Sequence, residues 1–322
     1  MRKIVVALFV VLLTASFSMN VSAAETQADK KAIVIAAFGT SHPPAVVSIL
    51  NLKNKMEQAF PKTTVKVAFT SNIIQDIWQK RGRDLKWQKA HPEIPVMLYT
   101  VKNPLATIAD LQNQGIRSIA VQSTHVFAGE EYTNLAAEIN ALASIKTLRD
   151  RDLPFKTLFL GRPALGKASD LHPYPEDIAH AARVLAADVA LAKKNKSALV
   201  YMGHGNEIFT TGAYMELESV LRDAHPDVSI FIGTVEGFPG PDQVLAGLKH
   251  AGVKKVTLIP FMIVAGDHAT NDMAGDEPDS WKNLMEAAGI KVKPVIRGLG
   301  EVDAWVDIYV QHLKEAMADS GF

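Results

Sequence analysis

The chain has 322 residues, of which 48% are hydrophobic and 21% are charged, and its formal net charge at pH 7 is zero. This composition predicts a globular protein with two domains of ordinary size and excludes an extended basic face for nucleic acid. Cysteine is absent, so disulfides, thiolate metal ligands and a thiol nucleophile are excluded, and any metal site must use histidine, carboxylate or backbone oxygen ligands.

Residues 1–24 have the pattern of a secretory signal peptide. Arg2 and Lys3 precede the apolar segment Ile4–Phe17, and Val21–Ala24 offers small residues for cleavage. The apolar segment is shorter than a typical membrane span. An uncleaved anchor is the alternative. Without cysteine there is no lipid attachment site. We therefore expect a periplasmic protein with no stable membrane span after cleavage. After cleavage the chain has 32 basic residues (34 less Arg2 and Lys3) and 34 acidic residues, so its net charge is about −2.

Strand-like and helix-like segments alternate along the rest of the chain. Strands are predicted at Ala32–Ala37, Thr64–Thr70, Val96–Thr100, Ile116–Gln122, Phe155–Leu160, Ala198–Met202, Val228–Ile232, Lys255–Ile259 and Val292–Val295. Helices are predicted at Val46–Phe60, Asn72–Lys80, Pro104–Gln114, Thr133–Ala143, Asp177–Ala190, Ala213–Ala224, Pro241–Ala251, Ser280–Ala288 and Val302–Met317. Several strands are continuous Val/Ile/Leu runs, which are typical of buried parallel strands. The alternation predicts a doubly wound α/β fold.

The two halves of the chain resemble each other. Gly115–Glu131 aligns with Gly252–His268 without a gap, and Ile33–Ser41 aligns less clearly with Leu199–Glu207. Chance similarity between βα units is the alternative, but we interpret the match as a duplicated domain, with the divide in the Gly/Pro-rich stretch Gly161–Pro175. The sequence thus predicts two similar α/β domains with parallel sheets flanked by helices and an active site in the cleft between them. The expected boundaries are 29–165, 166–300 and a C-terminal helix at 301–322.

Three strands of the second half end in candidate metal ligands. His204 lies in YMGHGNE, Glu236 in GTVEG and His268 in AGDH, each directly after an apolar run. Because the carboxyl ends of parallel strands meet at one edge of a sheet, we expect these side chains at one rim. Two imidazoles and a carboxylate suit cobalt, iron, nickel or zinc. A structural role for His204 between two glycines is the alternative. The alignment places Phe38 in the position of His204 and Glu131 in that of His268.

Other features give weaker indications. There is no HExxH helix, GxxxxGK[ST] loop, GxSxG elbow or GxGxxG fingerprint, so zincin, nucleoside triphosphatase, serine hydrolase and nicotinamide-dependent chemistry have no support. His42 and His125 are near the predicted rim and are candidate secondary contacts. The acids from Asp272 to Asp279 are expected mainly to cap and solubilise the following helix. The other histidines are expected to be solvated or packed: His91, His172, His180, His225, His250 and His312.

At these residues the sequence resembles the class II chelatases, in particular the anaerobic sirohydrochlorin cobaltochelatases of the CbiK type. The motifs that carry the resemblance are AFGTS (37–41), QSTHVFAGEEY (122–132), MGHG (202–205), GTVEG (233–237) and VAGDHATNDMAGDEPDSW (264–281). The resemblance implies a tetrapyrrole, sirohydrochlorin, held between the two domains. It implies Co²⁺ as the substrate metal, although Fe²⁺ or Ni²⁺ accept the same ligands, and no organic cofactor. The metal ligands it implies are His204, Glu236 and His268.

Metal insertion replaces two pyrrole N–H protons with a divalent cation, so one site must hold the metal and accept protons. We expect His204 and His268 to bind the metal, one of them also taking protons, and Glu131 to deprotonate or orient the macrocycle. The remaining expected substrate contacts are Phe38, Gly39, Thr40, Ser41, Glu130, Gly205 and Gly237. Phe38, Met262 and Phe127 are candidates for an apolar wall or for core. The alternatives are an exported metal- or haem-binding protein without turnover and an iron-inserting chelatase, and a homo-oligomer is compatible with the sequence.

Overall fold

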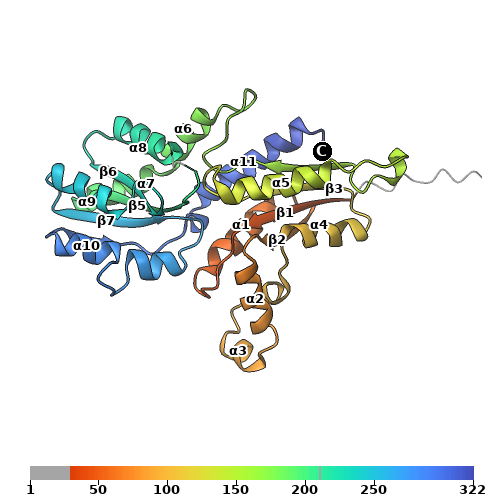
Figure 1. The fold of residues 1–322 in the computed structure, drawn as a ribbon, viewed down its shortest axis with the longest axis horizontal. Helices are drawn as coiled ribbons and strands as arrows, with labels where there is room; N and C mark the ends of the chain where they lie inside the picture. Colours follow the sequence, from red (N-terminus) through yellow and green to blue (C-terminus); the bar gives the residue numbers. More distant parts are fainter. Residues whose placement is uncertain (1–29, 210–211) are drawn as a thin grey trace, which may run out of the picture.

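The computed structural model describes residues 30–209 and 212–322. This part of the chain contains two four-stranded parallel sheets, each flanked by helices (Figure 1). The first sheet has the order β2-β1-β3-β4 and the second the order β6-β5-β7-β8, so the two sheets have the same topology. This agreement supports the internal repeat and confirms the predicted doubly wound α/β architecture. The strands are β1 (Lys31–Ala37), β2 (Thr64–Phe69), β3 (Ser118–Ser123), β4 (Thr157–Gly161), β5 (Ala198–Gly205), β6 (Ile230–Glu236), β7 (Lys255–Phe261) and β8 (Lys291–Pro294).

The central strands of both sheets are buried along nearly their whole length, which explains their continuous apolar sequences. Helices cover both faces and supply the apolar stripes that pack against them. Those of the first half are α1 (Val46–Ala59), α2 (Asn72–Arg81), α3 (Leu85–Ala90), α4 (Pro104–Asn113) and α5 (Glu130–Ala143). Those of the second half are α6 (Tyr174–Val184), α7 (Ala186–Asn195), α8 (Gly212–Ala224), α9 (Pro241–His250), α10 (Trp281–Ala287) and α11 (Asp303–Asp319). None of the helices in the described ranges is long and apolar enough to cross a bilayer.

The C-terminal helix α11 returns to the first half of the molecule. It packs against α1, β3 and β4 of the first half and against α6 (Figure 1). Trp305 and Tyr309 of this helix belong to one buried apolar cluster with Ile33 of β1 and Tyr201 of β5. The Tyr309 hydroxyl also donates a hydrogen bond to the Thr124 carbonyl at 2.9 Å. One continuous core therefore joins the two sheets.

A buried polar network lies at the same junction. Arg162, directly after β4, forms two hydrogen bonds with Asp177 of α6, at 2.7 and 2.8 Å. His312 of α11 contacts the same carboxylate through Nε2 at 3.0 Å, and Arg162 also pairs with Glu315 at 2.7 Å. Arg162, Asp177 and His312 are each less than 10% exposed. Since the network connects three segments that are distant in sequence, it fixes the passage of the chain from the first half to the second.

Two of the predicted elements are wrong. Val96–Thr100 is a 3-10 helix, η1, and not a strand; it follows Pro95, packs against α2, and lies outside both sheets. The single helix predicted over Asp177–Ala190 is two helices, because the backbone departs from helical geometry at Leu185, where ψ is −3°. The short helix α3 was not predicted. It extends α2 into an arm that projects from the first half (Figure 1).

The domain boundaries proposed from the sequence stay a prediction. The proposed signal peptide, residues 1–24, lies outside the described residues. The remaining predicted strands and helices are present, most of them with ends shifted by one to three residues. The carboxyl ends of the central strands lead into the loops that carry the candidate functional residues.

Candidate active site

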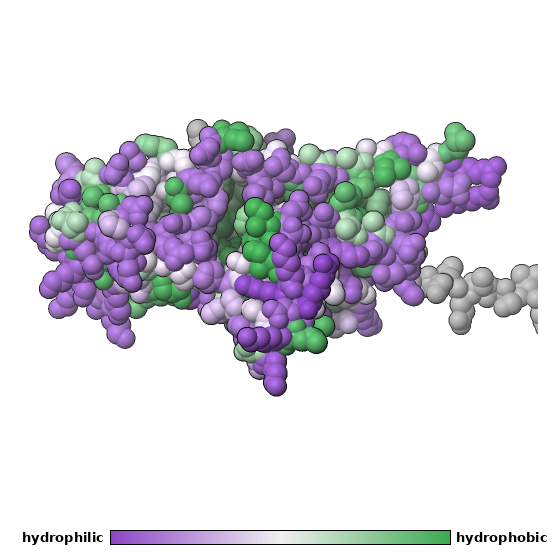
Figure 2. Space-filling view, turned by 60° about the horizontal axis from the view of Figure 1, so that its bottom comes forward, coloured by the Kyte–Doolittle hydropathy of each residue, from purple (hydrophilic) through white to green (hydrophobic). Residues whose placement is uncertain are grey.

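A cleft lies between the two halves, at the carboxyl ends of the central strands. It is lined by the segments that follow β1, β3, β5 and β7, and it encloses about 1250 Å³ including the open space at its mouth. Much of its wall is apolar, and a recess with hydrophobic residues is visible in an otherwise largely hydrophilic surface (Figure 2). The apolar lining residues include Phe38, Ile74, Val126, Phe127, Phe261, Met262, Ile263 and Val264. Phe38, Phe127 and Met262, the three candidates for an apolar wall, all line the cleft.

His204 is held at the end of β5 with a defined ring orientation. Its Nδ1 lies 2.9 Å from the Gly205 carbonyl oxygen, which can only accept a hydrogen bond, so Nδ1 carries a proton, and in the neutral ring the lone pair is on Nε2. Gly205 makes this turn possible, since its φ is +74° and a Cβ there would lie 2.0 Å from the Glu236 carbonyl oxygen. The backbone thus fixes both the place and the tautomer of this imidazole.

His268 begins the turn that follows β7. Its Nδ1 lies 2.5 Å from an Asp272 carboxylate oxygen, four residues further along. An ionised carboxylate only accepts hydrogen bonds, so Nδ1 again carries a proton, and in the neutral ring the lone pair is on Nε2. From the sequence, Asp272 was expected mainly to cap and solubilise the following helix. Its contact with His268 could have been suspected from the i, i+4 spacing.

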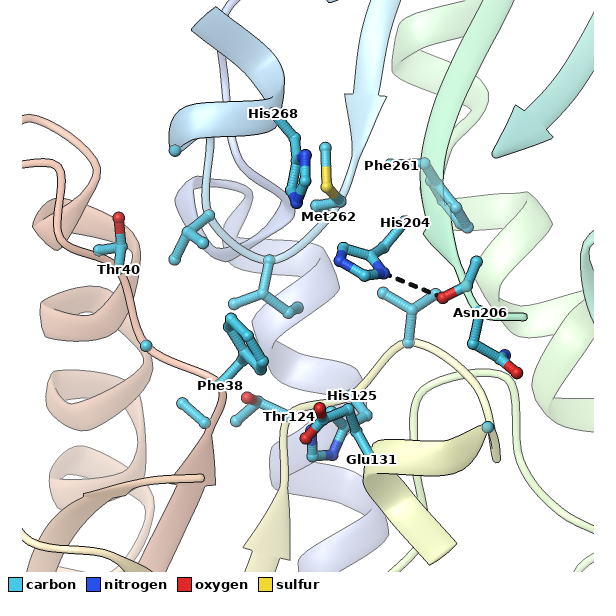
Figure 3. Close-up of a pocket in the computed structure, with 18 of the residues that line it drawn as sticks. Phe38, Thr40, Thr124, His125, Glu131, His204, Asn206, Phe261, Met262 and His268 are labelled. Carbon is cyan, nitrogen blue, oxygen red and sulfur yellow. Dashed lines mark hydrogen bonds between the residues drawn. The ribbon is translucent and has the colours of Figure 1, made fainter. Parts of the chain in front are cut away.

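The two imidazoles are close neighbours. Their ring centroids are 4.9 Å apart, with the ring planes at 82°. Figure 3 shows one nitrogen of each ring pointing into the cleft, while the other nitrogen of His204 is engaged with Gly205. Two lone pairs that converge in this way are suited to hold a borderline divalent cation and to leave its other coordination positions open.

Glu236 is placed differently from the two histidines. Its carboxylate approaches His204 at 3.9 Å, but on the Nδ1 side of the ring. Within residues 30–209 and 212–322 there is no ready-made group of three or more His, Asp or Glu side chains around a metal position. The histidine pair is therefore preassembled, and the third ligand inferred from the sequence, Glu236, stays a prediction.

The opposite wall comes from the first half of the molecule. The Phe38 ring, 42% exposed, faces His204 with centroids 6.4 Å apart. Glu130 and Glu131 form the first turn of α5 and line the same cleft. Partial burial raises the pKa of Glu131, and the neighbouring Glu130 raises it further, against a hydrogen bond from the Thr70 hydroxyl at 3.4 Å. A carboxylate with a raised pKa is a better proton acceptor than an ordinary glutamate.

The loop after β1 is fixed by contacts with α2. Trp78 donates from Nε1 to the Thr40 carbonyl at 2.7 Å, and Arg81 donates to the Ser41 carbonyl at 2.6 Å. Gly39 has a φ of +98°, and a Cβ there would touch the Phe69 ring at 2.8 Å. Gly39, Thr40 and Ser41 line the cleft as predicted contacts, and Gly205 does too. Gly237 is instead packed against the Asn206 backbone and is not among the lining residues.

Several cleft residues were not predicted to have a leading role. His125 is neutral in ordinary conditions, because burial lowers its pKa to about 4, and its Nδ1 pairs with the Ser123 hydroxyl at 2.8 Å. His42, a candidate secondary contact, lies 3.6 Å from Asp267 and links the two rims of the cleft. Asn206 orders the next loop by accepting hydrogen bonds from the backbone of Ile208 and Phe209. A lone histidine or asparagine in a loop carries no sequence signal for such roles.

The expectation that the acids after Asp272 cap the next helix is wrong. The N-cap of α10 is Ser280, whose hydroxyl accepts a hydrogen bond from the Asn283 backbone, and no acid lies in the first turn. Asp276 instead pairs with Lys282 at 3.4 Å on the surface. Serine is as good an N-cap as aspartate, so the sequence pattern did not distinguish them.

The charge of the cleft favours a cation. Its described lining contains the carboxylates of Glu130, Glu131, Glu236 and Asp267 and no lysine or arginine. Carboxylates around a concave, partly apolar site raise the local concentration of divalent cations. The cleft therefore combines carboxylates that attract a cation, a pair of imidazoles and an apolar wall.

Comparison with known proteins agrees with this chemistry. Residues 31–318 match the family described as Cobalt chelatase (CbiK). The sirohydrochlorin cobaltochelatase CbiKC of Nitratidesulfovibrio vulgaris (strain Hildenborough) is 32% identical over 289 residues, which are 90% of this chain and 91% of the relative. The sirohydrochlorin cobaltochelatase of Salmonella typhimurium is 32% identical over 290 residues, which are 89% of this chain and 97% of the relative.

A solved structure supports the fold. The sirohydrochlorin chelatase SirB from Bacillus subtilis subspecies spizizenii, determined in complex with cobalt, superimposes with a TM-score of 0.55 and 13% identity. The match covers 91% of this chain and 97% of that chain, and at this identity it bears on the fold alone. The family model extends over most of the chain and two relatives align along about nine-tenths of it, so this chain belongs to the cobalt chelatase (CbiK) family.

Proposed function

We propose that this chain is a sirohydrochlorin cobaltochelatase, which inserts Co²⁺ into the tetrapyrrole and releases two pyrrole protons. The observation that carries the proposal is the close pair of imidazoles of His204 and His268, each with its Nδ1 engaged and its other nitrogen turned toward a largely apolar cleft between the two halves. Relatives of this chain along nearly its whole length bear that name. Co²⁺ is here a substrate, so the site has to release it as well as bind it.

In this proposal the two walls of the cleft have different roles. His204 and His268 hold the metal ion on one side, and two imidazole ligands leave positions open for pyrrole nitrogens. On the other side, Phe38 offers a ring face to the macrocycle, and Glu131 offers a carboxylate whose pKa is raised. Protons leave the pyrrole nitrogens to such bases as the metal enters, and the net charge of the macrocycle–metal complex stays balanced.

The test is an insertion assay with matched histidine variants. Purified protein is mixed with Co²⁺ and metal-free sirohydrochlorin under anaerobic conditions, and the absorbance of the macrocycle is followed. His204→Ala and His268→Ala should each reduce insertion to the uncatalysed rate. His250→Ala, at an exposed position of α9, is the control and should insert at the wild-type rate. Wild-type protein that binds Co²⁺ but gives no acceleration would establish the rival function, metal or tetrapyrrole binding without turnover.

The same assay tests the choice of metal. Competition between Co²⁺, Fe²⁺ and Ni²⁺ at equal concentration should yield mainly the cobalt product. The two histidines accept all three ions, so the selectivity resides in rates and not in ligand type. A dominant iron product would identify an iron-inserting chelatase with the same fold.

We further propose that the protein is exported to the periplasm, on the basis of the signal-like pattern in residues 1–24. N-terminal sequencing of protein from a periplasmic fraction should begin at Glu25. A chain that begins at Met1 or Arg2 and fractionates with the cytoplasm would contradict export. Size-exclusion chromatography of the same preparation tests the proposal that the mature protein forms a homo-oligomer.

A further inference from the structure

We infer that Asp272 is the positioning residue of the metal site, which holds His268 in the tautomer that presents a free Nε2 lone pair to the cleft. The inference deepens the proposed function and rests on it for the assignment of the metal to His268. Asp272 makes a 2.5 Å contact with Nδ1 of His268. A carboxylate in this place is the partner that metal-binding histidines commonly use to fix ring orientation and raise ligand strength.

The geometry excludes Asp272 as a direct ligand on the same metal. The two nitrogens of an imidazole point to different sides of the ring, so a group bound at Nδ1 lies away from an ion bound at Nε2. Figure 3 shows one nitrogen of His268 directed toward His204 and Met262, into the cleft. The other nitrogen is the one that contacts Asp272. Asp272 thus acts on the metal through the ring of His268.

The turn between them is built to hold this contact. His268 is the N-cap of a π-helical turn, Ala269–Met273, which contains Asp272, and this rare backbone form is frequent at functional sites. Ala269 and Met273 are fully buried and anchor the turn in the core of the second half. The carbonyl of Asn271 would lie 2.4 Å from a Cβ at position 275, so Gly275 is needed for the turn to close.

Neighbouring polar side chains in the turn are occupied elsewhere. Thr270 donates to the Gly266 carbonyl at 3.1 Å, and Asn271 donates to Asp267 at 2.8 Å. Asp267 also faces His42 across the cleft. Asp272 is therefore the carboxylate of this segment that serves His268.

The two metal-binding histidines consequently differ. The Nδ1–H of His204 donates a hydrogen bond to a backbone carbonyl, whereas that of His268 donates to a charged carboxylate. Hydrogen bonds to a charged acceptor are roughly twice as strong as neutral ones, and they make the imidazole a stronger donor to the metal. His268 is the stronger of the two ligands, and its strength depends on one removable side chain.

The experiment compares Asp272→Ala and Asp272→Asn with Asp276→Ala. Asp276 lies in the same segment, is fully exposed and pairs only with Lys282 among the described residues, so its variant is the control. Co²⁺ affinity is measured by titration without tetrapyrrole. Tetrapyrrole affinity is measured separately by fluorescence quenching without metal. The tautomer of His268 is read from the ¹⁵N shifts of its ring, assigned by their loss in His268→Ala.

Asp272→Ala should weaken Co²⁺ binding about ten- to hundredfold, leave tetrapyrrole binding unchanged, and turn the His268 signal into a mixture of tautomers. Asp272→Asn keeps the shape but offers Nδ1–H only a neutral amide oxygen in place of a charged carboxylate, so it should bind Co²⁺ more weakly than the wild type. Wild-type Co²⁺ affinity in both variants would overturn the inference. Lost affinity in Asp272→Ala with an unchanged His268 tautomer would overturn it too, and would make Asp272 a ligand.

These readouts separate the inference from the proposed function. Neither the titration nor the NMR measurement needs turnover. A wild-type protein that binds Co²⁺ through an Asp272-dependent His268 but inserts no metal would refute the chelatase function and leave the role of Asp272 intact. If all three variants insert cobalt as efficiently as the wild type and bind Co²⁺ with the same affinity, the chelatase function is upheld and the role of Asp272 is refuted.

Discussion

Phe38, directly after β1, and His204, near the end of β5, occupy equivalent positions of the two sheets, and their rings face each other with centroids 6.4 Å apart at 46°. The two halves therefore differ at the same structural place. One half has a histidine there, and the other has an aromatic ring. Two sheets of the same topology thus present unlike walls to one cleft.

Replacement of Phe38 by alanine should weaken binding of the tetrapyrrole and not of the metal. Loss of an aromatic contact is worth about 0.5–1.5 kcal/mol, which corresponds to roughly two- to tenfold in affinity. Fluorescence quenching by metal-free sirohydrochlorin measures this change, and the Co²⁺ titration should stay as in the wild type. Leu85→Ala, an exposed apolar position on the arm, is the control. Equal tetrapyrrole affinity in Phe38→Ala and wild type would remove Phe38 from the binding wall.

Glu131→Gln should slow insertion while Co²⁺ binding is retained, because a glutamine cannot accept a pyrrole proton. Partial burial raises the pKa of Glu131, so the wild-type carboxylate becomes protonated at a higher pH than an ordinary glutamate. The wild-type rate should fall as the pH drops through this raised pKa. This fall of kcat at low pH should be absent from the pH profile of Glu131→Gln. If the fall persists in the variant, another group is the base.

The same substitution should stabilise the fold at neutral pH. The folded-state pKa of Glu131 lies above its unfolded value, so the ionised carboxylate costs stability above both values, and this cost disappears as the pH falls below the unfolded value. Glu131→Gln should thus have a higher Tm than the wild type at pH 7 and an equal Tm near pH 3. Calorimetry at the two pH values measures the difference, and a lower Tm at pH 7 would contradict it.

Arg162→Met should destabilise the protein strongly. Burial alone would raise the pKa of Asp177, but hydrogen bonds from Arg162 and His312 outweigh it and hold this pKa at about 2. The stability contributed by the ionised Asp177 is present above the ordinary aspartate pKa and is lost as the pH falls toward 2. Loss of one partner of a buried ion pair costs about 3–5 kcal/mol.

Denaturant unfolding measures this loss at two pH values. At pH 7 the variant retains a buried carboxylate without its main partner, whereas at pH 3 the carboxylate takes up a proton in the variant and the penalty shrinks. Arg162→Met combined with Asp177→Leu should recover part of the stability, since the buried carboxylate at position 177 is removed together with its partner. A penalty that is the same at both pH values would show that Arg162 acts through packing alone.

Gly205→Ala should disrupt the site far more than Gly252→Ala, although both glycines have a positive φ. A Cβ at Gly205 would lie 2.0 Å from the Glu236 carbonyl oxygen, whereas one at Gly252 would meet no atom within 4 Å. Gly252→Ala should cost about 1–2 kcal/mol from backbone strain alone. Gly205→Ala should cost more and should also abolish Co²⁺ binding, because the loop that orients His204 must shift. Equal unfolding free energies for the two variants would refute this account.

The fold was predictable from the sequence because its main signals are local. Continuous apolar strands separated by amphipathic helices define a doubly wound sheet, and the match between Gly115–Glu131 and Gly252–His268 placed the functional loops in equivalent positions. The main failure came from tertiary context. Val96–Thr100 has strand-like residues but no neighbouring strand to pair with, and only the tertiary structure shows this.

The sequence indicated which residues are candidates for the site, but it gave less information on the contacts between their side chains. His204 and His268 could be found because each follows a strand within a distinctive motif. The placement of Glu236 on the Nδ1 side of His204, and the pairing of Asp272 with His268, depend on side-chain direction and on a π-helical turn. Amino-acid patterns do not specify these features, since the same spacing suits a helix cap or a surface acid equally well.

The return of α11 to the first sheet has a consequence for biosynthesis. Trp305 and Tyr309 complete a core that begins with Ile33, so the first domain is finished only after the last segment of the chain has been made. Contacts of such large sequence separation form late and slowly. The nascent chain therefore leaves the ribosome with an incomplete N-terminal core. An export route that translocates unfolded polypeptide would act on this protein before its fold is complete, when little unfolding is required.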